Sequence, residues 1–95
     1  MPCITKETVR REVREANGAK YVYTLTAGEG QRVACFGLTL YSVSIEMTAN
    51  DGRITSSALD EIFVDSRRAI RFFDKLVSSL ATPIDLPYVL EDEMR

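Results

Sequence analysis

The most regular pattern of hydrophobic and polar positions lies in residues 65–80. Placed on a helix, the hydrophobic side chains of this stretch fall within an arc of about 160°, and the polar ones occupy the remainder. Asp65 or Ser66 can accept a hydrogen bond from an unpaired backbone N–H at the start. We therefore expect an amphipathic helix whose wide apolar side contacts both a sheet and a second helix. That side consists of Ala69, Ile70, Phe72, Phe73, Leu76, Val77 and Leu80.

A second helix is predicted to follow, because residues 82–85 read Thr-Pro-Ile-Asp. A threonine cap, a proline at the first helical position and an acidic residue three positions after the cap are typical of a helix start. Pro87 removes a backbone donor one turn later, so we expect a tight first turn or a kink there, and then helix to about Met94. The helical spacing is given by Leu86, Val89, Leu90 and Met94.

Residues 8–15 and 20–26 flank Asn17-Gly18, and the second of these stretches is rich in tyrosine, valine and threonine. Asn-Gly between such segments is the strongest short-range signal of a two-residue β-hairpin. The pattern therefore predicts a hairpin. Its cross-strand pairs would include Val13 with Val22 and Glu15 with Lys20.

The charged composition of residues 8–15 leaves a helix open as the alternative, because lysine, arginine and glutamate favour helices and Val9 and Val13 are four residues apart. The hairpin has a consequence for the character of one sheet face, which would be only half apolar. That face would carry Arg10, Glu12 and Arg14 together with Tyr21, Tyr23 and Leu25.

Residues 32–48 form the longest strand-like run, and their alternation changes phase part way. Apolar residues occupy even positions at Phe36, Leu38 and Leu40, and odd positions from Tyr41 to Met47. Because strand side chains alternate strictly, one flat strand would bury one set and expose the other. We expect a β-bulge near Leu40-Tyr41 to reconcile them, and a strand covered on both faces in its middle is the alternative.

A turn at residues 49–52 and a returning strand at residues 53–64 complete the pattern, with Asp60-Glu61 expected to face water. The length of 95 residues is that of one domain, residues 1–95. We predict an α+β fold, with an antiparallel sheet of about four strands followed by two antiparallel C-terminal helices packed on one face of the sheet.

The composition argues against an enzyme and against a metal site. The chain has no histidine and so lacks the commonest general base and zinc ligand. Cys3 and Cys35 lack Cys-x-x-Cys spacing and are interpreted as reduced thiols of a cytosolic protein. The glycines of residues 27–30 are not followed by the Lys-Ser/Thr of a phosphate loop. We predict no catalytic residue, cofactor or metal; an enzyme would require Cys35 to be an exposed thiolate beside a basic group.

Charge and hydropathy bear on partners and location. A net charge of −2 and a pI near 5.1 disfavour nucleic-acid binding, which is usually accompanied by a basic surface. No hydrophobic run approaches the length of a membrane span, and the first residues lack the basic-then-apolar order of a signal peptide. We expect a cytoplasmic protein that does not bind membranes.

Charges at the ends of the two predicted helices oppose the helix dipoles, since Arg67 and Arg68 begin the first helix and acidic residues 91–93 end the second. With Asp85, this acidic end could hold a weak Mg²⁺ or Ca²⁺ ion, but we favour the interpretation of a solvated helix end. A short connection makes the helices antiparallel neighbours, so the two charged ends should meet. We expect at least one ion pair that joins Arg67, Arg68 or Arg71 to Glu91 or Asp92.

Five short motifs stand out in residues 20–94: Tyr23-Thr24-Leu25, Phe36-Gly37-Leu38, Glu61-Ile62-Phe63-Val64-Asp65, Thr82-Pro83-Ile84-Asp85-Leu86 and Val89-Leu90-Glu91-Asp92. They resemble the pattern of a family of small bacterial proteins, mostly from Firmicutes, that share a domain of unknown function. That pattern has Tyr-x-Leu and Tyr-Gly-Ile strands, an acidic-Ile-x-x-Asp helix start, Ser-Pro-Ile-x-Leu and Val-Val-Glu-Asp. The chain departs from it at Pro87 and Ser56-Ser57, and the resemblance implies no activity.

We predict a small non-enzymatic protein-interaction or regulatory module, whose partner is another protein or a second copy held through an exposed sheet edge or a dimer interface. The alternative is a small-ligand or nucleic-acid binding domain, in which tyrosines on the sheet stack on rings and arginines bind phosphate. The candidate interaction residues are Tyr21, Tyr23, Tyr41, Arg67, Arg68, Arg71, Glu91 and Asp92.

Overall fold

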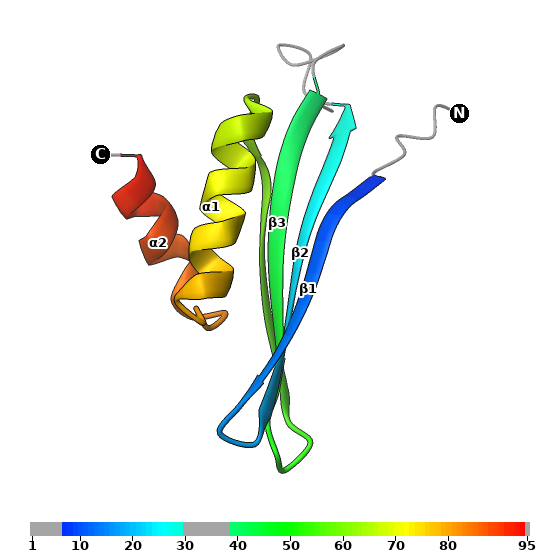
Figure 1. Ribbon diagram of the computed structural model, residues 1–95, viewed down its shortest axis with the longest axis vertical. Helices are drawn as coiled ribbons and strands as arrows, with labels where there is room; N and C mark the ends of the chain where they lie inside the picture. Colours follow the sequence, from blue (N-terminus) through cyan, green and yellow to red (C-terminus); the bar gives the residue numbers. More distant parts are fainter. Residues whose placement is uncertain (1–6, 30–38, 95) are drawn as a thin grey trace.

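The computed structural model describes residues 7–29 and 39–94. Its elements are β1 (Glu7–Ala16), β2 (Ala19–Glu29), β3 (Thr39–Thr48), β4 (Ile54–Phe63), α1 (Ser66–Ser78) and α2 (Leu86–Glu93). The strands form one antiparallel sheet in the order β1-β2-β3-β4. Both helices lie on the same face of the sheet and run in opposite directions (Figure 1). The predicted α+β architecture is confirmed.

The first two strands form the predicted hairpin, so the alternative helix over residues 8–15 is wrong. Asn17 and Gly18 both have positive φ angles, 54° and 78°, as a type I′ turn requires. The turn sets the register of the ladder from Ala16 back to Arg10, and the register shifts by one residue at Val9, between Thr8 and Arg10. Both expected cross-strand pairs form, Val13 with Val22 and Glu15 with Lys20.

The expected bulge near Leu40-Tyr41 lies in the neighbouring strand instead. β3 pairs with β2 in unbroken register from Thr39 to Thr48. Between the pairs Tyr41–Phe63 and Val43–Leu59, three β4 residues stand opposite the single β3 residue Ser42. The bulge is stabilised at its centre, where Glu61 has a φ of 55° and its N–H donates to Ser42 Oγ at 2.9 Å.

The phase change in β3 is explained by burial on both faces near the start of the strand, which was the alternative interpretation. Leu40 and Ser42 are buried on one face, and Val43 and Ile45 on the other. The earlier hydrophobic positions of this run, Phe36 and Leu38, lie outside the described residues.

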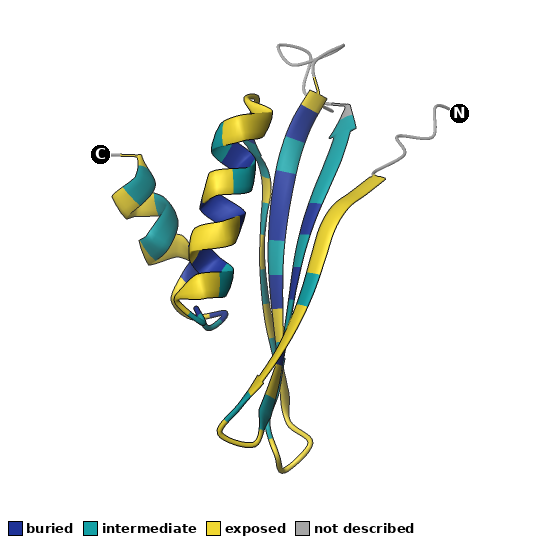
Figure 2. Ribbon diagram, in the orientation of Figure 1, coloured by how far each residue is buried: buried dark blue, intermediate teal, exposed yellow. Residues whose placement is uncertain are grey.

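The core lies between the sheet and the helices, where the buried residues of α1, β2 and β3 face one another (Figure 2). Phe73 and Leu76 of α1 are 0% exposed, which confirms the predicted apolar side of this helix. Burial of each such side chain contributes about 1.5–3 kcal/mol. The start of α1 is capped by Asp65, whose carboxylate accepts a hydrogen bond from the N–H of Arg67 at 2.9 Å.

α1 ends in a Schellman motif that turns the chain back toward α2. Leu80 has a φ of 54° and occupies the left-handed position that glycine usually takes. The N–H groups of Leu80 and Ala81 donate to the carbonyls of Val77 and Leu76, respectively. The Leu80 side chain packs against the core, and this contact compensates for the unfavourable backbone conformation.

Thr82 and Asp85 stabilise the turn that precedes α2. The N–H of Thr82 donates to Asp85 Oδ2 at 3.1 Å, and the N–H of Asp85 donates to Thr82 Oγ1 at 3.3 Å. The regular α-helix starts later than predicted, at Leu86, so the chain takes the tight first turn that was expected. Pro87 therefore lies within the first helical turn, where an N–H group has no partner inside the helix.

Candidate functional site

Two of the three candidate tyrosines belong to the core. Tyr21 and Tyr23 of β2 are 8% and 0% exposed, and their rings lie nearly parallel with centroids 6.3 Å apart. Tyr41 is half-buried in β3, opposite Phe63 of β4. The helices cover this face of the sheet, so Tyr21 and Tyr23 offer no surface on which a base or ligand ring could stack.

The hydroxyl group of Tyr23 has a structural role. It donates a hydrogen bond to the backbone carbonyl of Ala81 at 2.8 Å, and this links the middle of β2 to the α1–α2 connection. Burial, assisted by the neighbouring Tyr21, raises the pKa of Tyr23 to about 12. The phenol therefore stays protonated and remains a hydrogen-bond donor at any physiological pH.

Arg68 joins the start of α1 to the end of α2. Its Nη2 donates to the carbonyl of Glu93 at 3.2 Å, and its Nε lies 4.0 Å from Glu93 Oε2. The guanidinium carbon also lies 5.3 Å from the centroid of the Phe63 ring, a cation–π distance. One of the three predicted arginines thus bridges the helix ends.

The acidic partner of Arg68 is Glu93, and this corrects the expected partners Glu91 and Asp92. Helical spacing places Glu93 on the side of α2 that carries Leu86, Val89 and Leu90, which packs toward the core. The side chain of Glu93 is only 17% exposed, whereas Glu91 and Asp92 are exposed. The same spacing was available in the sequence and could have identified the correct residue.

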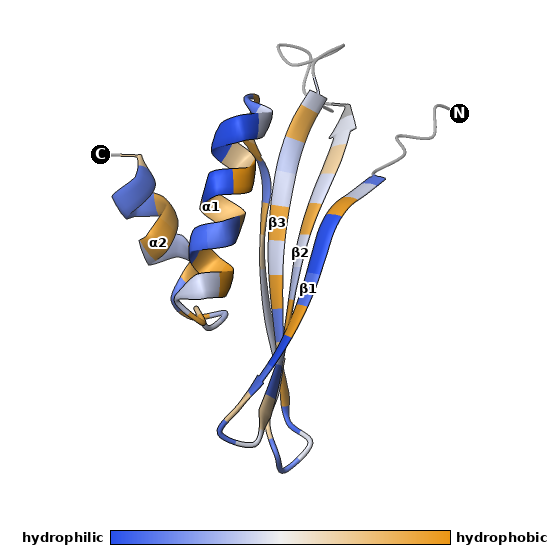
Figure 3. Ribbon diagram, viewed as in Figure 1, coloured by the Kyte–Doolittle hydropathy of each residue, from blue (hydrophilic) through white to orange (hydrophobic). Residues whose placement is uncertain are grey.

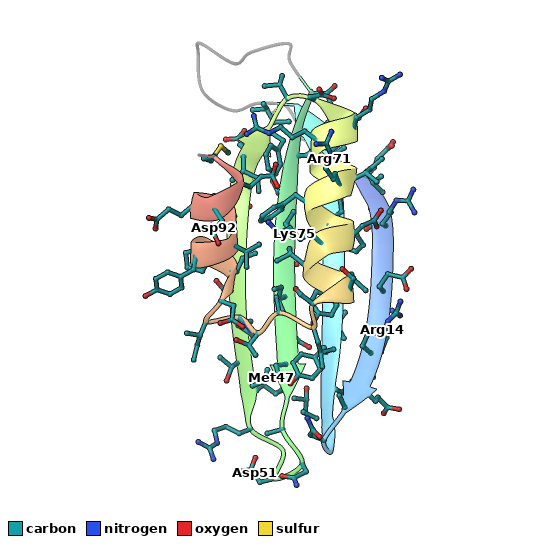
Figure 4. All side chains as sticks on the ribbon, turned by 60° about the vertical axis from the view of Figure 1, so that its left-hand side comes forward. Arg14, Met47, Asp51, Arg71, Lys75 and Asp92 are labelled. Atoms are coloured by element: carbon teal, nitrogen blue, oxygen red, sulfur yellow. The ribbon has the colours of Figure 1, made fainter. Side chains whose placement is uncertain are left out.

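The remaining arginines do not converge on a site. Arg67 and Arg71 are exposed on α1, as is Lys75. Figure 4 shows Arg71 and Lys75 projecting from α1 and Asp92 from α2. The structure therefore separates the predicted interaction residues into a buried tyrosine pair, one bridging arginine and scattered surface charges.

A groove that sequence reasoning missed lies between β1 and α1. It has a volume of about 480 Å³. β1 lies to one side of α1, so the helix does not cover this strand (Figure 4). Arg14 Nη1 lies 3.0 Å from Glu12 Oε2 on the strand side of the groove. The sequence places Glu12 and Arg14 on one face of the sheet, but it does not show which residues of the helix lie opposite them. The lining residues are Glu12, Arg14, Asp74, Val77, Ser78 and Leu80.

The outer side of α2 and the turn before it carry a second feature, to which the sequence prediction assigned no role. Ile84 and Tyr88 are four residues apart, and they are 72% and 66% exposed. Ile84 lies in the turn before α2, and Tyr88 lies on the side of α2 away from Leu86, Val89 and Leu90, which pack on the core. Two exposed apolar side chains this close in the sequence are candidates for contact with another protein.

The described residues contain neither a side-chain cluster suited to a metal ion nor a helix that could span a membrane. Within residues 7–29 and 39–94, no group of three or more histidine, cysteine, aspartate or glutamate side chains is placed to hold a metal ion. None of the helices described here is long and apolar enough to cross a membrane. Cys3 and Cys35 lie outside the described residues.

Comparison with known proteins gives one match. The family model described as "Family of unknown function (DUF6514)" matches residues 4–95. No curated protein and no solved structure matches the chain. The match covers nearly the whole chain, and the description of the family assigns no activity.

Proposed function

The chain belongs to the family of unknown function DUF6514, and we propose that it is a non-enzymatic protein-interaction module that binds a protein partner through the outer side of α2 and the turn before it. The observation that carries this proposal is the exposure of Ile84, in the turn before α2, and of Tyr88, in α2, both above 60%, while the other side of α2 is packed. Burial of two such side chains at an interface would be favourable, and tyrosine is enriched among residues that dominate binding energy.

The charges of α2 indicate the chemistry of that partner. Asp85, just before the start of α2, and Glu91 and Asp92, near its end, are exposed. An apolar centre with a polar rim is the usual composition of a protein interface. A partner that presents an apolar pocket bordered by lysine or arginine would complement this surface.

The alternative of a nucleic-acid or small-ligand binder receives less support. It relied on tyrosines at the surface, and Tyr21 and Tyr23 are core residues. Among the arginines, Arg68 is engaged with Glu93 and Phe63. Exposed Arg67 and Arg71 remain, and two cations on a chain of net charge −2 make a weak phosphate site.

The proposal includes a location, the bacterial cytoplasm. Its support is the resemblance of the sequence motifs to those of small bacterial proteins. Fractionation of cells that express the tagged chain at natural levels would test it, and recovery in the membrane or secreted fraction would contradict it.

The interaction is tested by affinity purification with the full-length chain as bait, in wild-type form, as I84S/Y88S and as I54S. Ile54 is the matched control because it is 63% exposed but lies at the start of β4. We expect proteins that wild type and I54S retain in equal amounts and that I84S/Y88S loses. Equal retention by all three forms, or no protein specific to wild type, would contradict the proposal.

A further inference from the structure

β1 forms one edge of the sheet, and no described strand lies on its outer side. It is a ten-residue strand, and hydrophilic residues occupy much of it (Figure 3). Charged residues on an edge strand commonly prevent pairing with other chains. The effect of these charges on pairing depends, however, on their signs and their order along the strand, because opposite charges placed across from one another favour pairing.

The hairpin geometry determines which backbone groups of β1 are available at that edge. In an antiparallel pair, residues bonded to the neighbouring strand alternate with residues whose N–H and C=O point away from it. Ala16 and Ala19 close the two-residue turn and are a bonded pair. By alternation, the backbone groups of Glu15, Val13 and Arg11 point away from β2 toward the free edge. A second strand can bond only to these residues.

We propose that two copies of this chain pair through their β1 edges, antiparallel, with Val13 of one copy opposite Val13 of the other. This arrangement joins the available backbone groups of each copy to the same groups of its partner. It also places opposite charges across from one another at each charged pair. The pairs are Arg11 with Glu15 and Glu12 with Arg14, each occurring twice by symmetry.

A two-fold axis at any other residue of this segment would not place opposite charges across from one another at every charged pair. Every residue from Arg10 to Glu15 except Val13 is charged, so a two-fold axis at any other of these positions puts a charge against its own copy. An axis at Glu12, for example, also brings Arg10 opposite Arg14. Registers shifted by a single residue would set an available backbone group against one already bonded to β2. Charge order and hydrogen-bond direction therefore select the same register.

The local structure leaves room for this pairing. Val13 is 37% exposed, so contact between the two copies would remove apolar surface from water. The groove beside α1 leaves Glu12 and Arg14 accessible on the helix side of β1. Arg14 now pairs with Glu12 of its own strand at 3.0 Å, and in the dimer each Arg14 can contact the second copy's Glu12 instead. The other edge, β4, lacks such complementarity, because its charges, Asp60 and Glu61, are both acidic.

This inference goes beyond the proposed function, since it concerns another surface and needs no other protein. It is tested on the purified full-length chain by sedimentation equilibrium over a range of concentrations. Wild type is expected to be a dimer that dissociates on dilution, with a dissociation constant that rises with salt. The variant E12R/E15R places arginine opposite arginine at all four charged pairs, and we expect its dissociation constant to rise by at least tenfold.

Further variants separate pairing from folding. The exchange E12R/R14E reverses both members of one pair, so it should dimerise like wild type. V13P removes an N–H that points away from β2, so β1 should keep its bonds to β2 while the dimer is lost, and far-ultraviolet circular dichroism will show that the sheet is intact. S56R on β4 is the control and should remain dimeric. A wild-type monomer at all concentrations, or dimers unchanged in E12R/E15R and V13P, would overturn the proposal.

Discussion

The hydroxyl of Tyr23 lies 2.8 Å from the backbone carbonyl of Ala81, to which it donates a hydrogen bond across 58 positions of sequence. Both residues are buried, Tyr23 completely and Ala81 at 3% exposure. The bond fixes the α1–α2 connection against the centre of the sheet. It therefore contributes to the placement of α2, the helix whose outer side carries the proposed binding surface.

Tyr23→Phe tests this bond. We expect the free energy of unfolding to fall by about 1–2 kcal/mol, because the ring is kept while the buried carbonyl of Ala81 loses its donor. Urea denaturation of wild type and variant measures the difference. Tyr88→Phe is the matched control, since its hydroxyl is on a side chain that is 66% exposed, and no measurable change is expected. A loss of equal size in both variants would contradict the role assigned to Tyr23.

The raised pKa of Tyr23, about 12, predicts a loss of stability at high pH. In the unfolded chain the phenol loses its proton near its ordinary pKa of roughly 10, whereas the folded protein retains it to about 12. The contribution is complete below pH 10 and is lost as the pH rises through 12. Urea denaturation between about pH 9 and 12 should show a steeper decline for wild type than for Tyr23→Phe. Parallel declines would show that Tyr23 titrates normally.

Arg68→Ala should loosen the end of α2. We expect a loss of about 1–2 kcal/mol, since the variant removes a hydrogen bond to a carbonyl, a cation–π contact and a partly exposed ion pair. Hydrogen exchange should become faster in the last turn of α2 than elsewhere. Arg67→Ala and Arg71→Ala are the controls, because both residues are exposed, and each should change stability by less than about 0.5 kcal/mol.

Glu93→Gln separates the two contacts of Arg68. It removes the charge at the 4.0 Å contact but leaves the hydrogen bond from Arg68 to the backbone carbonyl of Glu93. We therefore expect a loss of less than about 1 kcal/mol, smaller than that of Arg68→Ala. A loss equal to that of Arg68→Ala would assign the stabilisation to the ion pair.

Two aspartates at opposite ends of α2 give opposite expectations. Asp85→Ala removes the acceptor for the N–H of Thr82 and should destabilise the protein by about 1 kcal/mol. Asp92→Ala removes an exposed negative charge near the helix C-terminus and should stabilise the protein by a few tenths of a kcal/mol. Thermal unfolding followed by circular dichroism measures both. Destabilisation by Asp92→Ala would indicate a contact for this side chain that outweighs the helix dipole.

The local elements followed from the sequence because each depends on neighbouring residues. Asn17-Gly18 set the turn and hence the pairing of Val13 with Val22. The spacing of apolar residues in α1 identified its buried side, including Phe73 and Leu76. Turn chemistry and helical periodicity act over a few positions, so turns and helices can be predicted without knowledge of the rest of the chain.

Tertiary structure decided the features that depend on how these elements pack. Alternation divides a strand into two faces but does not say which face the helices cover, so the sequence offers Tyr21 and Tyr23 as candidate interaction residues although they lie in the core. The position of the bulge at Glu61 follows from the pairing of β4 with β3, and the groove beside β1 follows from the docking of α1 on the sheet. Docking depends on contacts between residues far apart in sequence, and local patterns do not encode the position of one element on another.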